Sequence, residues 1–130
     1  MRSDAREAAF KIVFADLLGG DGEKNFRAGV YRLAKLKEEE IAFAERIVNA
    51  VLMHKDELSR EIAETVTRFA DYRIYPADKA AMLIALAEIR FMDDIPPVVS
   101  VSEATAIARK YSTEKSADFV NGVLGGIINK

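Results

Sequence analysis

The stretch from Ala80 to Phe91 constrains the fold more than any other part of the chain. It reads Ala-Ala-Met-Leu-Ile-Ala-Leu-Ala-Glu-Ile-Arg-Phe and is apolar on almost every side of a helix. A helix that is apolar all round has to be buried, so we expect this one at the centre of the molecule. Pro76 fits its first turn, where the missing N–H leaves no hydrogen bond unmade.

The segments on either side also carry helical rather than strand periodicity. Their apolar residues recur at steps of three and four, the spacing of one helix face. Positions with this spacing include Ala5, Ala8, Ile12, Val30, Leu33, Ile41, Ala44, Val48, Val120, Val123 and Ile127. No segment shows convincing strand alternation. The pattern therefore predicts an all-α domain of five to seven helices.

Side chains that cap helix N-termini predict where several helices begin. Ser3, Ser100 and Ser116 are candidate N-caps, and Glu103 follows Ser100 at the spacing of a capping box. Between residues 37 and 69 neither glycine nor proline interrupts the helical pattern. We therefore expect one long or bent helix over that segment.

Length and charge limit what the domain does. The chain has 130 residues, with 19 basic and 21 acidic side chains and a net charge of −2. We expect a single domain, 1–130, made of helical halves at 1–70 and 76–130 that share a core. Proteins that bind nucleic acid tightly and alone usually carry a basic excess. RNA binding by this chain would therefore need a local basic patch or a partner.

No signal in the sequence points to export or to a membrane. The N-terminus has no apolar signal region. The longest apolar run, Ala80 to Ala87, is too short for a bilayer, which takes roughly 18 residues or more. There is no cysteine to form a disulfide. We therefore expect a cytoplasmic protein.

No group of residues predicts an enzyme or a metal site. His54 is the only histidine, and it lies among charged residues on a predicted helix. A general base needs a positioned partner, so a solvated position is the simpler interpretation of His54. One histidine without cysteine leaves only carboxylates as metal ligands. We expect no catalysis, no metal and no cofactor.

Glu88 is a single acid inside the most apolar helix, and two interpretations stay open. In the first, Glu88 lies at an exposed edge of the helix. In the second, its carboxylate faces a partner protein beside apolar neighbours such as Met82 and Leu86, a composition common at protein interfaces.

The last predicted helix breaks a local rule. It contains Gly122, Gly125 and Gly126. Each glycine costs roughly 1 kcal/mol relative to alanine in a helix interior, so close packing against a neighbouring helix is one interpretation. In a functional interpretation, Phe119 stacks on a base, Asn121 hydrogen-bonds its edge, and Lys115 lies near the phosphate.

Two short regions carry a local basic surplus. Between residues 105 and 130 the basic residues are Arg109, Lys110, Lys115 and Lys130, against Glu114 and Asp118. Near the N-terminus, Arg2 and Arg6 lie four apart on one helical face, with Lys11 around the helix from them. These charged residues either lie on the solvent-exposed faces of ordinary helices or form a surface that binds RNA.

Several motifs resemble the NusB family of bacterial transcription factors in order and spacing. They are Ala5-Arg6-Glu7-Ala8-Ala9, Asp93-Asp94-Ile95-Pro96-Pro97-Val98-Val99, Glu103-Ala104, Ala108-Arg109-Lys110-Tyr111, and Ser116 followed by Phe119-Val120-Asn121-Gly122-Val123-Leu124. The likeness is strong over roughly 76–128 and moderate over 1–18, and between them it rests on helix pattern alone.

The resemblance implies a fold of two three-helix bundles, with six or seven helices packed into one compact domain. It also implies a transcription antitermination factor without enzymatic activity. Such a factor binds single-stranded boxA RNA together with NusE, a small-subunit ribosomal protein. The assembly joins NusA, NusG and RNA polymerase in ribosomal RNA transcription.

The resemblance also places functional residues on this sequence. RNA contact falls on Arg2, Arg6, Lys11, Phe14, Lys115, Phe119 and Asn121. NusE contact falls on Asp78, Met82, Glu88, Asp94 and Pro96. The chain departs from the family in its few N-terminal arginines, in Leu83 and Ala87 where many members have arginine and tyrosine, and in Ser102 where asparagine is frequent.

Two other functions fit the same fold. The first is a helical protein-interaction adaptor with little direct RNA contact, which the acidic net charge favours. The second is the accessory RNA-binding domain of a ribosomal RNA methyltransferase, although the sequence has no glycine-rich cofactor motif. In each case the free protein is a possible homodimer, because apolar surface reserved for a partner can pair with itself.

Overall fold

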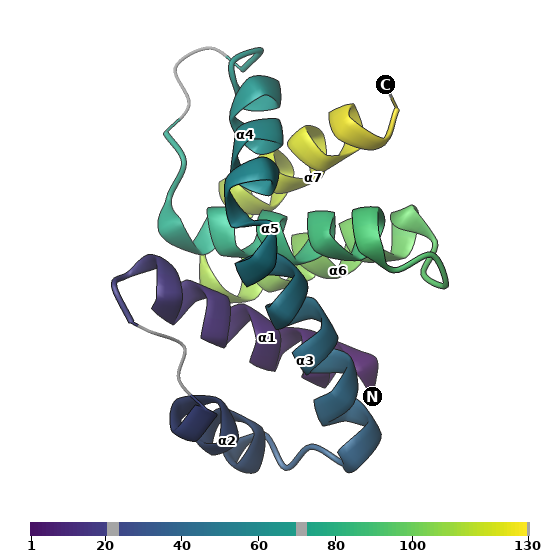
Figure 1. The fold of residues 1–130 in the computed structure, drawn as a ribbon. Coiled ribbons are helices and arrows are strands. Elements are labelled where there is room, and N and C mark those ends of the chain that lie inside the picture. Colours follow the sequence, from purple (N-terminus) through teal and green to yellow (C-terminus); the bar gives the residue numbers. More distant parts are fainter. Residues whose placement is uncertain (21–23, 70–72, 130) are drawn as a thin grey trace.

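The computed structural model describes residues 1–20, 24–69 and 73–129, and within these ranges it contains seven helices and no strand (Figure 1). The helices are α1 (Arg2–Leu17), α2 (Lys24–Leu33), α3 (Glu38–Met53), α4 (Lys55–Val66), α5 (Pro76–Phe91), α6 (Pro97–Tyr111) and α7 (Glu114–Ile128). The predicted all-α class and the predicted helix number are confirmed.

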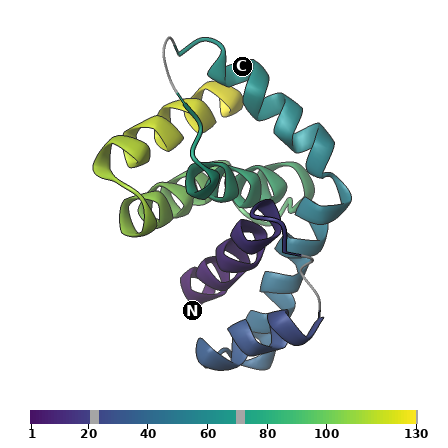
Figure 2. The same cartoon turned by 90° about the vertical axis from the view of Figure 1, so that its left-hand side faces the viewer.

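Helix α5 lies at the centre, as its all-round apolar sequence predicts. It packs against α1, α3, α4, α6 and α7, and Figure 2 shows these helices arranged around it. Every side chain from Ala80 to Ala87 is at most 1% exposed. Pro76 stands in the first turn of the helix, also as predicted.

The buried side chains of the N-terminal and C-terminal helices form one continuous hydrophobic core. Helix α1 contributes to it by packing against α3, α5 and α6. The division into halves at 1–70 and 76–130 therefore stays a prediction. Within the described ranges, no helix combines the length and hydropathy needed to cross a bilayer.

Two predicted helix starts are wrong because the capping serines bond to distant carboxylates instead. Helix α1 begins at Arg2, and the Ser3 hydroxyl donates to Glu103 at 2.6 Å. Helix α6 begins at Pro97, so Ser100 lies one turn inside it and donates to Glu88 at 2.9 Å. The predicted capping box between Ser100 and Glu103 does not form.

The start of α7 was predicted too late along the chain. Thr113 caps this helix, and its hydroxyl accepts a hydrogen bond from the Ser116 amide at 2.9 Å. Thr113 has the extended backbone of an N-cap residue, with φ −132° and ψ 167°. The Ser116 hydroxyl instead donates to buried Asp78 at 3.0 Å, which ties α7 to the start of α5.

The predicted long or bent helix is divided at His54, where the backbone leaves helical geometry with φ −116° and ψ 23°. The ring of His54 stacks on Phe91 of α5 with centroids 4.1 Å apart. Its side chain is 28% exposed, so His54 is partly buried rather than fully solvated as predicted. The chain changes direction between α3 and α4 without a glycine or a proline, at the residue whose ring packs against α5.

The glycine face of α7 packs against α4. A β-carbon on Gly122 would lie 3.4 Å from the ring of Phe69, and one on Gly126 would lie 3.5 Å from the methyl group of Thr65. Both are ordinary contact distances, so an alanine side chain would fit at either position, and nothing lies within 4 Å of a β-carbon added to Gly125. The predicted close packing therefore does not explain why these three positions are glycine.

Candidate nucleic-acid interface

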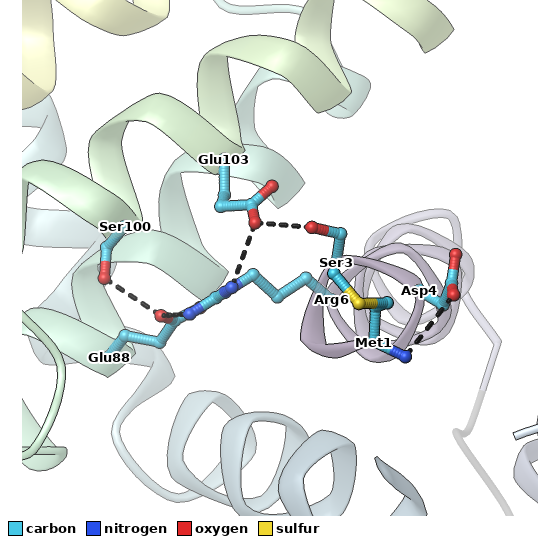
Figure 3. Close-up of polar contacts among 7 residues, drawn as sticks. All are labelled: Met1, Ser3, Asp4, Arg6, Glu88, Ser100 and Glu103. Carbon is cyan, nitrogen blue, oxygen red and sulfur yellow. Dashed lines mark hydrogen bonds and ion pairs between the residues drawn. The ribbon is translucent and has the colours of Figure 1, made fainter. Parts of the chain in front are cut away.

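Arg6 of α1 is buried rather than presented to solvent. Its residue exposure is 3%, and Figure 3 shows its guanidinium reaching toward α5 and α6. Nε and one terminal nitrogen donate to the two carboxylate oxygens of Glu88 at 2.8 and 2.9 Å. The other terminal nitrogen donates to Glu103 at 3.1 Å. The predicted exposure of Glu88 at a helix edge is therefore wrong, because Glu88 is only 1% exposed.

The buried Ser100 also bonds to Glu88, and the exposed Ser3 bonds to the partly buried Glu103 at the edge of this polar cluster (Figure 3). A buried charge is tolerated when it is paired and hydrogen-bonded. The cluster therefore holds α1 against α5 and α6. Arg6 has no free surface for RNA, and its predicted RNA contact is corrected to a structural role.

A row of aromatic rings runs from α1 to the end of α6. Phe10 and Phe14 stack with centroids 5.8 Å apart and an interplanar angle of 8°. Phe10 also contacts Tyr111, at 5.1 Å and 30°. Phe10 is only 3% exposed, whereas Tyr111 is 37% exposed, and Phe14 is partly buried. The buried ring of Phe10 thus lies between the partly buried Phe14 and the exposed Tyr111.

Charged side chains surround the exposed end of this row. The Nζ atoms of Lys11 and Lys110 lie 5.8 and 5.4 Å from the centre of the Tyr111 ring. Glu7 accepts a hydrogen bond from Lys110 at 2.8 Å and another from the Tyr111 hydroxyl. This arrangement joins α1 to the C-terminal turn of α6.

The pKa directions in this group follow from these contacts. Partial burial raises the pKa of Glu7, but hydrogen bonds from Lys110 and Tyr111 together bring it below its ordinary value. Partial burial, and then the hydrogen bond to Glu7, raise the pKa of the Tyr111 hydroxyl. Glu7 therefore stays ionised and Tyr111 stays protonated at neutral pH.

Sequence reasoning did not assign Tyr111 or Glu7 to the site, and it counted Lys110 only within the local basic surplus. The available signal was the pair Lys110-Tyr111, a base beside an aromatic residue within the local basic surplus. What the sequence could not show is that the end of α6 lies beside the middle of α1.

Arg2 lies apart from the aromatic row. Its guanidinium covers the ring of Phe43 at 4.3 Å and lies 3.7 Å from the carboxylate of Asp94. Nine helical steps separate Arg2 from Lys11, which is about 14 Å at 1.5 Å per residue. The structure therefore does not gather the predicted basic residues of α1 into one patch.

The predicted RNA-contact residues of α7 do not lie together on one surface either. Lys115 is exposed, but the ring of Phe119 is 6% exposed and meets Phe69 edge-on at 5.8 Å. A buried ring offers no face to a base, so the predicted stacking role of Phe119 is corrected to core packing. Asn121 is exposed on another side of the helix, where it lines an open groove between α6 and α7 with Arg109.

Three of the predicted partner contacts are corrected because the residues are buried. Asp78 and Met82 are 0% exposed, and Glu88 is 1% exposed. The predicted partner-facing role of Glu88 is replaced by its pairing with Arg6. Asp94 and Pro96 are exposed in the turn between α5 and α6, and Asp94 lies 3.7 Å from both Arg2 and Arg46.

The exposed groups of this surface are of kinds that bind ligands. Within the described ranges, no group of three or more histidine, aspartate or glutamate side chains is placed to hold a metal ion. The exposed ring of Tyr111 can stack on a planar group. The lysines around it can neutralise phosphate. These are the two contacts through which proteins commonly hold single-stranded nucleic acid.

Comparison with known proteins gives one family. The NusB family model matches residues 3–129. Transcription antitermination protein NusB of Clostridium botulinum is 32% identical, with 98% of this chain and 99% of the relative covered. Thermotoga maritima NusB superposes with a TM-score of 0.84 at 25% identity, covering 100% of this chain and 92% of that one. A solved complex of the antitermination factors NusB and NusE with double-stranded RNA contains a chain with the same fold, with a TM-score of 0.85 at 24% identity, covering 98% and 96%. The chain belongs to the NusB family.

Proposed function

We propose that the chain is a transcription antitermination factor that binds single-stranded boxA RNA together with NusE. The observation that carries the proposal is the surface where α1 meets α6, with an exposed aromatic ring and lysines around it. Single-stranded RNA is commonly held by base stacking on aromatic rings and by cations near its phosphates. Similarity to proteins named for antitermination supports the same function.

The distribution of charge explains why a partner is part of the proposal. The whole chain carries a net charge of −2, and Arg2, Arg109 and Lys110 each lie within ion-pair distance of an acid. Lys11 and Lys115 make no ion pair with any residue in the described ranges. Few cations are therefore ready for phosphates, and weak, salt-sensitive binding follows for the protein alone.

We assign NusE to the exposed turn between α5 and α6, which carries Asp94 and Pro96. Val98 beside it is 67% exposed and adds apolar surface of the kind that partner proteins cover. The same surface is the one that a homodimer of the free protein would use. The complete assembly includes NusA, NusG and RNA polymerase, acts in the cytoplasm and has no catalytic step.

A titration of labelled boxA RNA tests this function. Fluorescence anisotropy is recorded with the chain alone, with NusE alone and with both, against boxA RNA and a scrambled RNA of equal length. The proposal predicts weak binding by the chain alone and much tighter, boxA-selective binding by the pair. Equal affinity for both RNAs, or no gain from NusE, would remove the proposal.

The adaptor function has one observation in its favour. The guanidinium of Arg6 is hydrogen-bonded to Glu88 and Glu103, so α1 offers fewer cations to RNA than its sequence suggests. The alanine variants of Lys11 and Lys115 separate the two functions. Unchanged RNA recruitment by the complex of the double variant with NusE supports an adaptor, whereas weaker recruitment supports direct contact.

A further inference from the structure

We propose that Tyr111 is the base-stacking residue of this RNA surface. A nucleobase of single-stranded RNA lies against the exposed part of its ring, and Lys11 and Lys110 hold the adjoining phosphates. This inference rests on the proposed RNA-binding function and adds to it the residue that carries the base contact.

The Tyr111 ring is fixed before any ligand arrives. One side of it packs against Phe10, which is stacked in turn on Phe14. Its hydroxyl donates to Glu7, so the ring is held at both its apolar body and its polar tip. A ring that is already immobile loses little conformational entropy when a base stacks on it, and this raises the affinity that stacking provides.

Exposure separates Tyr111 from Phe10 in the same aromatic row and from Phe119 of α7. Phe10 and Phe119 are 3% and 6% exposed, so their rings serve the core, whereas Tyr111 is 37% exposed. A residue that only closed the contact between α1 and α6 would need no exposed ring. The solvent-exposed part of Tyr111 is where we place the base.

The lysines beside the ring supply the second half of a nucleotide site. The side chain of Lys110 is 61% exposed, and Lys11 is exposed as well. Both ammonium groups lie over the ring, 5.8 and 5.4 Å from its centre, so they move aside toward the phosphates when a base stacks there. Lys110 is paired with Glu7 at 2.8 Å and contacts a phosphate only by leaving that carboxylate.

Variants of Tyr111 separate stacking from the hydrogen bond to Glu7. Tyr111→Phe keeps the ring and removes the hydroxyl, whereas Tyr111→Leu removes both. Phe26→Leu is the matched control, because Phe26 on α2 is 42% exposed and lies outside this surface. Circular dichroism melts establish that each variant is folded at the assay temperature.

The measurement is the Kd of each variant, saturated with NusE, for labelled boxA RNA. Stacking of one base is worth about 1–3 kcal/mol, which is roughly a 5- to 150-fold weakening for Tyr111→Leu. Tyr111→Phe and Phe26→Leu should stay within about twofold of the wild type. A wild-type Kd for Tyr111→Leu, or equal losses for the Phe and Leu variants, overturns the inference.

A second readout covers the case in which Tyr111→Leu fails to fold. BoxA RNA carrying 5-iodouridine at one position at a time is irradiated in complex with the wild-type chain and NusE, and the crosslinked peptide is sequenced. The inference predicts a crosslink at Tyr111, and crosslinks confined to other residues overturn it. If the wild-type pair does not bind boxA RNA at all, the proposed function fails first and the inference falls with it.

Discussion

Arg6 and Glu7 are neighbours in sequence and sit in opposite environments on α1. Arg6 is buried and pairs with buried Glu88 and with Glu103, whose side chain is 25% exposed. Glu7 lies at the surface and pairs with Lys110 and Tyr111. Both residues join α1 to α6 through charged hydrogen bonds.

The cluster around Arg6 and the cluster around Glu7 differ in whether a ligand can reach their charged groups. No ligand reaches Glu88, so the interior cluster fixes the position of α1 and takes no part in binding. At the surface, a phosphate can take over Lys110 from Glu7, and a base can cover Tyr111. Burial, rather than charge or residue type, therefore separates the structural cluster from the proposed RNA surface.

The largest effect is expected from breaking the interior cluster. Glu88→Ala leaves the guanidinium of Arg6 buried with one carboxylate less, and loss of one partner of a buried ion pair costs about 3–5 kcal/mol. Urea unfolding measures the free energy of unfolding. Glu61→Ala is the control, because Glu61 pairs with Arg90 at the surface and such pairs contribute about 0–1 kcal/mol. An equal loss of unfolding free energy in both variants would show that the interior cluster contributes no more to stability than a surface ion pair.

A second, intermediate effect is expected from removing exposed cations. The Lys11→Ala, Lys115→Ala double variant should keep wild-type stability. Each lost phosphate contact lowers the slope of log Kd against log salt by about 0.7, and two contacts are worth roughly tenfold in affinity at 0.15 M salt. Anisotropy titrations with NusE at several salt concentrations give both values. An unchanged slope contradicts phosphate contact by these lysines.

The smallest effect concerns Glu7 and pH. The pKa of Glu7 in the folded protein lies below its ordinary value of 4.5, so its contribution to stability is present above about pH 4.5 and is lost as the pH falls through the folded pKa. The melting temperature of the wild type should therefore exceed that of Glu7→Gln at neutral pH, and the gap should close in acid. A gap that stays constant from pH 7 to pH 3 contradicts the assigned cause.

The fold was predictable where the pattern of apolar residues is local. The run from Ala80 to Ala87 predicts a buried helix because every face of that helix is apolar. Helix starts were less predictable, because a serine hydroxyl can cap its own helix or bond to a distant acid. The hydroxyls of Ser3, Ser100 and Ser116 all bond to distant acids, a choice that depends on how the helices pack.

The site was less predictable because its groups come from distant parts of the chain. Arg6 and Glu88 are 82 residues apart. Arg6 shares its helical face with Arg2, so only Glu88, a single acid in the most apolar helix, signalled a buried polar group. Tyr111 carried no comparable signal. Its exposure depends on where α6 ends beside α1, which the local sequence does not specify.

A crosslinking map of the complex tests the central claim most directly. The chain, NusE and boxA RNA substituted with 5-iodouridine or 4-thiouridine are irradiated, and the contact residues are identified by mass spectrometry. Our account predicts contacts at Tyr111, Lys11 and Lys110, and none at Arg6. Contacts at Arg6 or Phe119, with the surface where α1 meets α6 left free, would contradict it.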